Sequence, residues 1–339
     1  MKTIGIVGIA KNTGKTTTTN ALIEDLYRTS TPFCVTSIGY DGEEIDNITA
    51  LPKPRISLNK GTLVVTAADC IAPQAESYRI LRQTEIPTVL GNIQICQTEK
   101  PVNAVVAGPK TGDDLQRVME MLQDFACDVL LVDGALNRVA PFVKVENLVI
   151  AVGPSANHNL DELAQEIKLI VDLTRLPVWQ CKGAPCKGAP FPFPGKSAAG
   201  SQSVNVDPQK KAIWVHGPVY ARTLHTKIED FCRNTPVSAL IIESALHLLS
   251  GSEYRDIQRF MQYLRKAGLE LYTQKQIRLS GLTINPAYPV PLKKGLNDYE
   301  LRYVDEQLFR QKLRAWLDDE THIFNVKKES VQPLLEQAV

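Results

Sequence analysis

The sequence predicts an α/β fold with a mostly parallel sheet that is covered by helices on both faces. Three observations lead to this prediction. Short apolar runs alternate with amphipathic helical patterns, a glycine-containing loop separates the first run from the first helix, and 339 residues are enough to bury a full core. Apolar runs without alternation fit strands that are buried on both faces, as parallel strands are.

The first 27 residues predict a strand, a phosphate-binding loop and a helix. The loop has the pattern Gly-x-x-x-x-Gly-Lys-Ser/Thr, with Gly8, Gly14, Lys15 and Thr16 at its fixed positions. The glycines let successive backbone N–H groups point at an anion, and the helix that begins near Lys15 adds the positive end of its dipole. This pattern is typical of P-loop NTPases, which bind a nucleoside triphosphate.

The polar groups of the loop have predicted tasks. Lys15 is expected to act in catalysis, because its ammonium group lies near the β- and γ-phosphates, and the Thr16 hydroxyl is expected to bind Mg²⁺. ATP is favoured over GTP because the chain has no Asn/Thr-Lys-x-Asp element to read guanine. The predicted cofactors are therefore ATP and Mg²⁺. The residues expected to bind the nucleotide are Gly8, Lys11, Asn12, Thr13, Gly14, Lys15, Thr16 and Thr17.

Two aspartates at the ends of apolar runs are candidate metal ligands. Asp133 follows four apolar residues and precedes Gly134-Ala135, so it is expected to hold Mg²⁺, with a strand-end turn as the alternative. Asp41 follows the second apolar run and is expected as a catalytic group or a further metal ligand, with an Asp-Gly turn as the alternative. Asn137 and Arg138 could contact the γ-phosphate or lie in a surface loop.

The remaining elements are expected in chain order. Helical spacing of apolar residues marks the helices, and runs rich in Val, Ile and Leu mark the strands. Strands are expected at 33–38, 61–66, 103–108, 128–134, 147–153, 212–217, 238–243 and 281–285. Helices are expected at 16–27, 113–125, 160–173, 223–233, 253–267 and 297–317. One sheet running through both halves is favoured, with a split into two domains as the alternative.

Composition changes sharply after residue 177. Residues 181–200 read CKGAPCKGAPFPFPGKSAAG, which cannot bury enough apolar area to offset its ordering entropy. The segment 180–211 is therefore expected to be an exposed insertion or linker. The predicted organisation is a P-loop domain at residues 1–290 that contains this insertion, followed by a C-terminal helical segment at 291–339.

Charge and composition limit the classes of partner. The chain has 38 Lys and Arg residues against 37 Asp and Glu residues, so no nucleic-acid partner is indicated. No apolar run reaches the length of a membrane span, and the N-terminal residues do not resemble a signal peptide. Seven cysteines spread along the chain do not fit a disulfide framework. A cytoplasmic protein without membrane association is expected.

The phosphate loop and the apolar run before Asp133 resemble the branch of P-loop proteins that contains dethiobiotin synthetase, the MinD/ParA ATPases and nucleotide-dependent metallochaperones. Many ATPases of that branch carry an extra lysine directly after the first glycine of the loop. This chain has Ile9 there, and its Lys11 lies two positions later. The role of that lysine across a dimer therefore does not carry over by alignment, and an oligomer remains open.

A narrower similarity covers residues 1–155 and is carried by the strings Gly8–Thr18, Thr36–Glu43, Lys53–Ile56, Lys60–Leu63, Ala107–Pro109 and Val132–Arg138. Together these strings resemble the P-loop subunit of the lysine 5,6-aminomutase reactivase. The resemblance implies ATP-dependent rescue of an adenosylcobalamin- and pyridoxal-phosphate-dependent aminomutase, with that aminomutase and a second, MutS-like ATPase subunit as partners.

Three classes of function remain open. The favoured one is an ATPase that drives a conformational cycle on a partner protein, because a bound γ-phosphate can hold switch segments that hydrolysis releases. The second is a small-molecule ligase or kinase of the dethiobiotin-synthetase type. The third is a nucleotide-gated cofactor chaperone that does not hydrolyse ATP. Basal turnover, and its stimulation by a protein or by a metabolite, separates the three.

Overall fold

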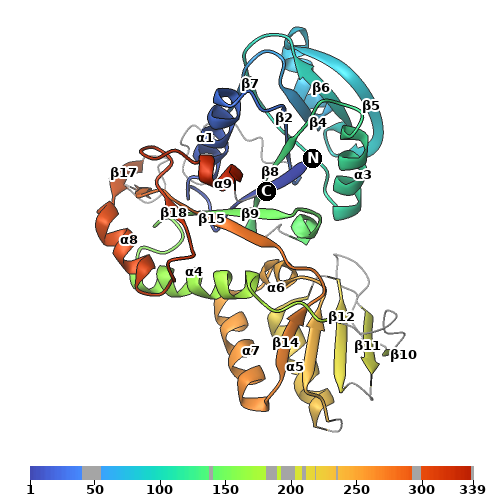
Figure 1. Ribbon diagram of the computed structural model, residues 1–339, viewed down its shortest axis with the longest axis vertical. Coiled ribbons are helices and arrows are strands. Elements are labelled where there is room, and N and C mark those ends of the chain that lie inside the picture. The colour runs from blue at the N-terminus through green and yellow to red at the C-terminus, as the bar shows by residue number, and fades with distance from the viewer. Residues whose placement is uncertain are drawn as a thin grey trace. The chain divides into compact units, whose positions relative to one another are not determined.

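The computed structural model describes residues 1–39, 55–136, 140–180, 189–191, 203–207, 211–217, 219–233, 236–291 and 299–336. The chain forms two compact units (Figure 1). Unit 1 comprises Met1–Leu136, Lys144–Gln165 and Leu279–Val339, and unit 2 comprises Asn137–Val143 and Glu166–Arg278. Each unit has its own main sheet, so the expectation of one sheet through both halves is wrong. An apolar run predicts a strand but does not specify which strands it pairs with.

Unit 1 is built on a nine-stranded sheet. The strands β1, β2, β4, β8 and β9 pair in parallel, whereas β6 pairs antiparallel with β4 and β5. This confirms the expected mostly parallel sheet. In spatial order its strands are β18 (Ile323–Phe324), β15 (Arg278–Ile284), β9 (Asn147–Val152), β1 (Lys2–Gly8), β8 (Val129–Ala135), β2 (Phe33–Ser37), β4 (Leu63–Ala67), β6 (Gly91–Thr98) and β5 (Tyr78–Thr88).

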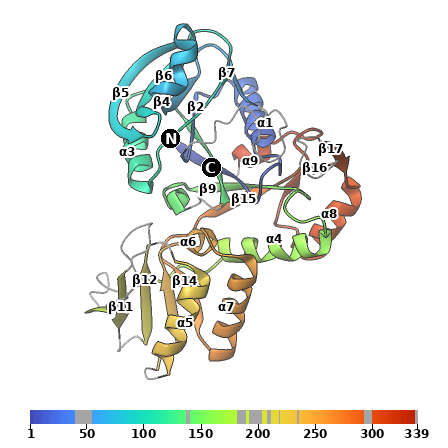
Figure 2. The same cartoon turned by 180° about the vertical axis from the view of Figure 1, so that it is seen from behind.

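Helices cover both faces of this sheet. Helices α1 (Lys15–Arg28) and α9 (Gln332–Glu336) lie on one side, and α3 (Gly112–Leu122) lies on the other (Figures 1 and 2). The buried stripe of α1, which includes Leu22 and Leu26, packs with the strand residues Ile4 and Ile6 in the main core. The short helical elements are α2 (Ala68–Ile71) and the 3₁₀ helices η1 (Ala72–Ser77) and η3 (Ala140–Lys144), and a longer helix, α4 (Leu160–Thr174), follows β9.

Several elements of unit 1 differ from the sequence prediction. The hairpin of β5 and β6 was not expected, and its register shifts twice along β5, so no regular alternation marks it in the sequence. The strand expected at 103–108 is short: β7 (Val102–Ala104) pairs only with β3 (Ile56–Leu58), outside the main sheet. The expected tail helix is α8 (Glu306–Arg314), preceded by an antiparallel pair of β16 (Ala287–Pro291) and β17 (Tyr299–Tyr303).

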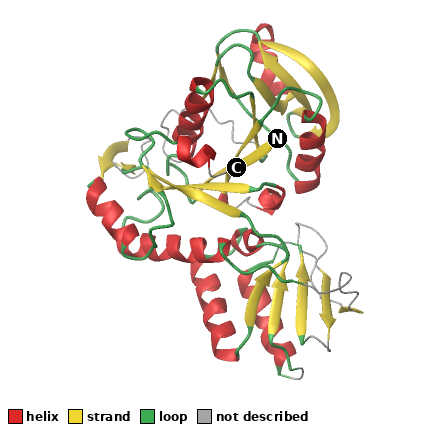
Figure 3. Cartoon of the chain, viewed as in Figure 1, coloured by secondary structure: helices red, strands yellow, loops and turns green. Residues whose placement is uncertain are grey.

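Unit 2 is built on a five-stranded sheet in the order β10-β11-β12-β13-β14. Strands β12 (Ala212–His216), β13 (Ala239–Ile242) and β14 (Glu270–Thr273) pair in parallel, and β10 (Ala189–Phe191) and β11 (Ser203–Asp207) extend them antiparallel. The helices are α5 (Ala221–Cys232), α6 (Ala245–Leu249) and α7 (Tyr254–Ala267), of which α5 and α7 pack together (Figure 3). The segment expected as an insertion thus contributes two strands, while 181–188 and 192–202 lie outside the described residues.

Two further expectations concern the membrane and the cysteines. None of the helices described is both long and apolar enough to cross a lipid bilayer. The five cysteines within the described ranges are free thiols. Three of them, Cys34, Cys96 and Cys127, are buried, so they contribute to packing as small apolar side chains.

Candidate functional site

The glycine-containing loop of residues 8–14, hereafter the phosphate loop, connects the carboxyl end of β1 to the first turn of α1. Gly14 caps the helix with φ +96°, a conformation that side chains rarely adopt, and a Cβ there would lie 2.8 Å from the Cβ of Asn285. A Cβ on Gly8 would lie 2.9 Å from Oγ1 of Thr13. Both glycines are therefore required by the backbone path. The first turn of α1 contains no acidic residue, so its N–H groups are suited to an anion.

Hydrogen bonds from two other strand ends brace the phosphate loop. The backbone carbonyl of Asn12 accepts bonds from Ser155 Oγ at 3.3 Å and from Asn285 Nδ2 at 3.2 Å. Within the loop, Thr13 Oγ1 donates to the carbonyl of Ala10 at 3.0 Å. Asn12 itself has φ +61°. These hydrogen bonds restrain the backbone of the phosphate loop before a ligand binds, which reduces the conformational entropy lost when an anion binds.

The roles of Ser155 and Asn285 were not predicted. Asn285 follows β15 and precedes a proline, a pattern that is typical of a turn. Its amide instead donates to Asn12 and to the carbonyl of Ala287, also at 3.2 Å. Ser155 has no distinguishing sequence pattern. Backbone bracing of this kind depends on strand order, which the sequence did not specify.

Asp133 and Lys15 meet beside the phosphate loop. Asp133 lies near the carboxyl end of β8, in register with Ile6 of β1 and Ser37 of β2. Its Oδ2 lies 3.2 Å from Lys15 Nζ, and the two side chains are 10% and 14% exposed. The ion pair is thus largely withdrawn from water, where the attraction between the charges is stronger than at a surface. The structure brings together the two charged groups that the sequence predicted to share a site.

Threonines of α1 fasten the helix behind the loop. Thr18 Oγ1 donates to the Gly14 carbonyl at 3.1 Å and lies 2.7 Å from Thr283 Oγ1 of β15. Thr19 Oγ1 donates to the Lys15 carbonyl at 3.2 Å. Both threonines are buried, whereas the expected ligands Thr16 and Thr17 are partly exposed at the loop. The run of four threonines therefore combines two structural residues with two that solvent or a ligand can reach.

The end of β2 is fixed by Gly108, whose steric role was not predicted from the sequence. A Cβ on Gly108 would lie 1.9 Å from the carbonyl oxygen of Ser37, so only glycine fits there. The Gly108 N–H donates to Ser37 Oγ at 3.0 Å, and Gly39 N–H donates to the Pro109 carbonyl at 3.0 Å. Asp41, expected two residues beyond Gly39, lies outside the described residues.

The loop residues and Asp133 converge at the carboxyl edge of β1 and β8. Lys11 is exposed, and Asn137 and Arg138, like Asp41, fall outside the described ranges.

The donor set fits Mg²⁺ rather than a metal held by protein ligands alone. No group of three or more His, Cys, Asp or Glu side chains that could hold a metal occurs in the described part of the chain. Asp133 offers one carboxylate, and Thr16 offers one hydroxyl in the first turn of α1. Mg²⁺ commonly takes one or two protein oxygens and completes its shell with phosphate oxygens and waters, so this sparse set is suitable.

Comparisons with known proteins are weak. No protein-family model matches the sequence, and no curated protein matches it. Among solved structures, pNOB8 ParA bound to nonspecific DNA shares 14% identity over 52% of this chain and 62% of that chain, with a TM-score of 0.27. Another pNOB8 ParA structure shares 10% identity over 99% and 98%, with a TM-score of 0.30. The signal recognition particle receptor FtsY from Elizabethkingia anophelis shares 12% identity over 92% and 65%, with a TM-score of 0.24.

These likenesses do not identify an activity. The chain spans less than two thirds of the length of the DNA-bound ParA chain and of the FtsY chain. None of the three structures supports the narrower resemblance to an aminomutase reactivase. The P-loop NTPase fold is recognised from the strand, loop and helix at residues 2–28 and from the parallel sheet around them.

Proposed function

We propose that this P-loop NTPase fold binds ATP with Mg²⁺ and hydrolyses it. The observation that carries the proposal is the Lys15–Asp133 pair, with 3.2 Å between Nζ and Oδ2, beside a loop whose glycines are sterically required. The pair supplies a cation for phosphate oxygens and a carboxylate for a metal at one place. An anion-binding loop alone would hold a phosphate, but this combination suits phosphoryl transfer.

Each residue of the site has a role in this proposal. Backbone N–H groups of the phosphate loop and of the first turn of α1 hold the phosphates, and Thr16 and Asp133 hold Mg²⁺. When bound, Mg²⁺ neutralises charge on the β- and γ-phosphate oxygens. With a nucleotide bound, Lys15 would exchange its contact with Asp133 for a phosphate oxygen, and the Asp133 carboxylate would then be available as a metal ligand. Asp41 is proposed as the group that orients water or adds a metal ligand. The nucleotide-binding set remains Gly8, Lys11, Asn12, Thr13, Gly14, Lys15, Thr16 and Thr17.

The chain connections favour a conformational cycle over small-molecule chemistry. Asp133 lies in β8, and the residues Asn137–Val143 that follow β8 belong to unit 2. Asn285, which braces the phosphate loop, follows β15, whose first residue Arg278 is the last residue of unit 2. Two of the four chain connections between the units therefore adjoin strands of the site. We propose that nucleotide turnover changes the state of unit 2, which acts on a partner protein.

The finer proposal is reactivation of an adenosylcobalamin-dependent aminomutase. It is supported only by the sequence resemblance of residues 1–155 to the P-loop subunit of the lysine 5,6-aminomutase reactivase. In that case the partners are the aminomutase and a second, MutS-like ATPase subunit.

The test is Mg²⁺-dependent phosphate release from ATP and from GTP. We expect turnover with ATP, and loss of at least about 100-fold in Lys15→Ala, because a cation that contacts the transferred phosphoryl group contributes several kcal/mol. Lys100→Ala, at a surface ion pair with Glu76, is the matched control and should turn over normally. Full activity of Lys15→Ala would contradict the site assignment.

Stimulation distinguishes the classes of function. Turnover that rises only when an inactivated aminomutase and its MutS-like subunit are added supports reactivation. Turnover that rises with a small acid or amine supports a ligase or kinase instead. Tight ATP binding without turnover under either condition supports a nucleotide-gated binding protein.

A further inference from the structure

A pocket lies in unit 1, at the edge of the sheet opposite the phosphate loop. It has a volume of about 670 Å³ and is bordered by Phe33 and Leu63, the first residues of β2 and β4. Strands β1, β8, β2 and β4 are parallel, and the phosphate loop follows the last residue of β1. The pocket therefore lies at the amino ends of the strands and is separate from the nucleotide site.

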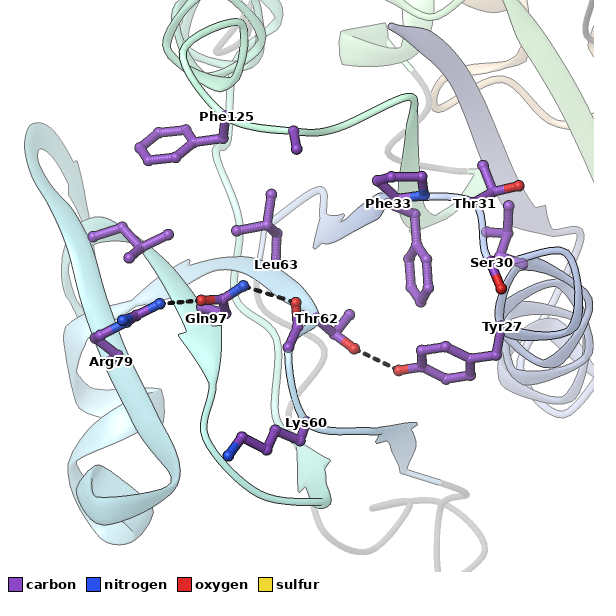
Figure 4. A pocket seen from close by; sticks show the side chains of 15 residues that line it. Tyr27, Ser30, Thr31, Phe33, Lys60, Thr62, Leu63, Arg79, Gln97 and Phe125 are labelled. Atoms are coloured by element: carbon purple, nitrogen blue, oxygen red, sulfur yellow. Dashed lines mark hydrogen bonds between the residues drawn. The ribbon is translucent and has the colours of Figure 1, made fainter.

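The walls of this pocket are apolar on one side and basic on another. Phe125 and Leu81, which are partly exposed, supply the accessible apolar surface, and the edges of Leu26, Phe33 and Leu63, each at most 5% exposed, lie beneath it (Figure 4). Lys60 and Arg79 are also among its lining residues, all of which the structure describes, and no Asp or Glu is among them. Pockets of this size that are mostly apolar with a few polar groups are typical of small-ligand sites.

The polar groups at the pocket are held in place by hydrogen bonds. The hydroxyl oxygen of Tyr27 lies 2.6 Å from Thr62 Oγ1 and accepts a bond from the Asn59 N–H at 2.7 Å. Gln97 donates from Nε2 to the Gly61 carbonyl at 3.0 Å and accepts a bond from Arg79 Nη2 (Figure 4). Arg79 is thus oriented by its neighbour rather than left to rotate, which lowers the entropic cost of binding.

The two cations have capacity left for a ligand. Arg79 uses Nε in an ion pair with Glu99 at 3.3 Å and Nη2 in its bond to Gln97, and a guanidinium has five N–H donors. Lys60 forms no ion pair with any carboxylate in the described ranges. A ligand with a negatively charged group would therefore find two cations on the pocket wall, one of which, Arg79, keeps N–H donors beyond those used by Glu99 and Gln97.

We propose that this pocket binds a small planar aromatic anion. The ring lies against Phe125 and Leu81, and its carboxylate or similar acid group faces Arg79 and Lys60. The proposal is independent of ATP binding, because none of these residues belongs to the phosphate loop or contacts Asp133.

The experiment uses the chain of residues 1–339 without nucleotide and measures binding by isothermal titration calorimetry. The probe is 2-naphthoate, and its uncharged analogue 2-naphthamide has the same ring system without the charge. We expect 2-naphthoate to bind at least about tenfold more tightly than 2-naphthamide, since hydrogen bonds to a charged acceptor are the stronger ones. Lys60→Gln and Arg79→Gln should each weaken 2-naphthoate by about three- to tenfold.

Two further variants complete the test. Phe125→Ala should weaken both probes, because it removes apolar contact with the ring. Lys100→Gln, a surface cation outside the pocket that pairs with Glu76, should leave 2-naphthoate binding within twofold of the unsubstituted protein. Absence of 2-naphthoate binding, equal affinity for the two probes, or equal affinity in Lys60→Gln and Lys100→Gln would each overturn the proposal. Unchanged urea unfolding of Lys60→Gln confirms that any loss of binding is local.

Discussion

The buried hydroxyl pair behind the phosphate loop allows a quantitative test of how α1 is anchored. Thr18 Oγ1 donates to the Gly14 carbonyl at 3.1 Å and lies 2.7 Å from Thr283 Oγ1. A hydroxyl carries one proton, so Thr283 must be the donor in the shorter bond. The two residues are 1% and 2% exposed, so water does not replace a lost partner.

The two single substitutions should therefore differ in cost. Thr18→Val leaves the Thr283 proton buried without its acceptor, at a cost of about 2 kcal/mol of unfolding free energy. The Gly14 carbonyl is not stranded, because it also accepts the Thr18 N–H at 2.9 Å. Thr283→Val removes a donor but leaves the Thr18 proton on Gly14, at about 1 kcal/mol. The double variant places two methyl groups together and should also cost about 1 kcal/mol, which gives a coupling of about 2 kcal/mol.

The assay is urea unfolding of the four proteins of this cycle, followed by tryptophan fluorescence. Trp316 belongs to unit 1, whereas Trp179 and Trp214 belong to unit 2. A background in which both unit 2 tryptophans are replaced by Phe makes the signal report on unit 1 alone. If the cost of the double variant equals the sum of the two single costs within about 0.5 kcal/mol, the assigned hydrogen-bond direction and the hydrogen bond between Thr18 and Thr283 are both wrong.

Three further predictions concern the loop, the thiols and the second unit. Gly14→Ala should abolish ATP binding in a calorimetric titration while the protein stays folded. The reason is that Gly14 has φ +96° and that a Cβ there would lie 2.8 Å from the Cβ of Asn285, and both disfavour a side chain. Burial raises the pKa of Cys96 to about 12 and that of Cys127 to about 11, so a disulfide reagent near neutral pH should label both only as the protein unfolds. Burial lowers the pKa of His247 in the folded protein in spite of the nearby Glu243 carboxylate. The contribution of His247 to the unfolding free energy is therefore full above its unfolded pKa of 6.5 and falls as the pH drops below that value. His247→Gln should reduce this pH dependence of the unfolding midpoint of unit 2.

The sequence predicted the local elements of the site well. The pattern Gly8 to Thr16 required a strand before it and a helix after it, and the structure has β1 and α1 there. Asp133 was expected near the end of a strand because four apolar residues precede it. The register of β8 beside β1 places its carboxylate next to Lys15. Such features depend on residues close together in the chain, whose spacing is visible in the sequence.

Features that depend on strand order could not be predicted. Gly108 has no motif of its own, yet its lack of a side chain allows the close approach of Ser37, 71 residues away in the sequence. Asn285 likewise acts on Asn12 only because its strand joins the sheet next to β9. The five-stranded sheet of unit 2 was missed for the same reason, since its apolar runs resemble those of unit 1.

The long separation between the phosphate loop and its brace has a consequence for synthesis. Asn12 leaves the ribosome 273 positions before Asn285. At roughly 5–20 residues per second, translation reaches Asn285 only about 14–55 s later. Until then the loop lacks the amide that holds it, and the nascent chain cannot display its finished phosphate site. Premature termination within unit 2 therefore yields a product that contains the complete phosphate-loop motif but lacks the Asn285 amide that braces it.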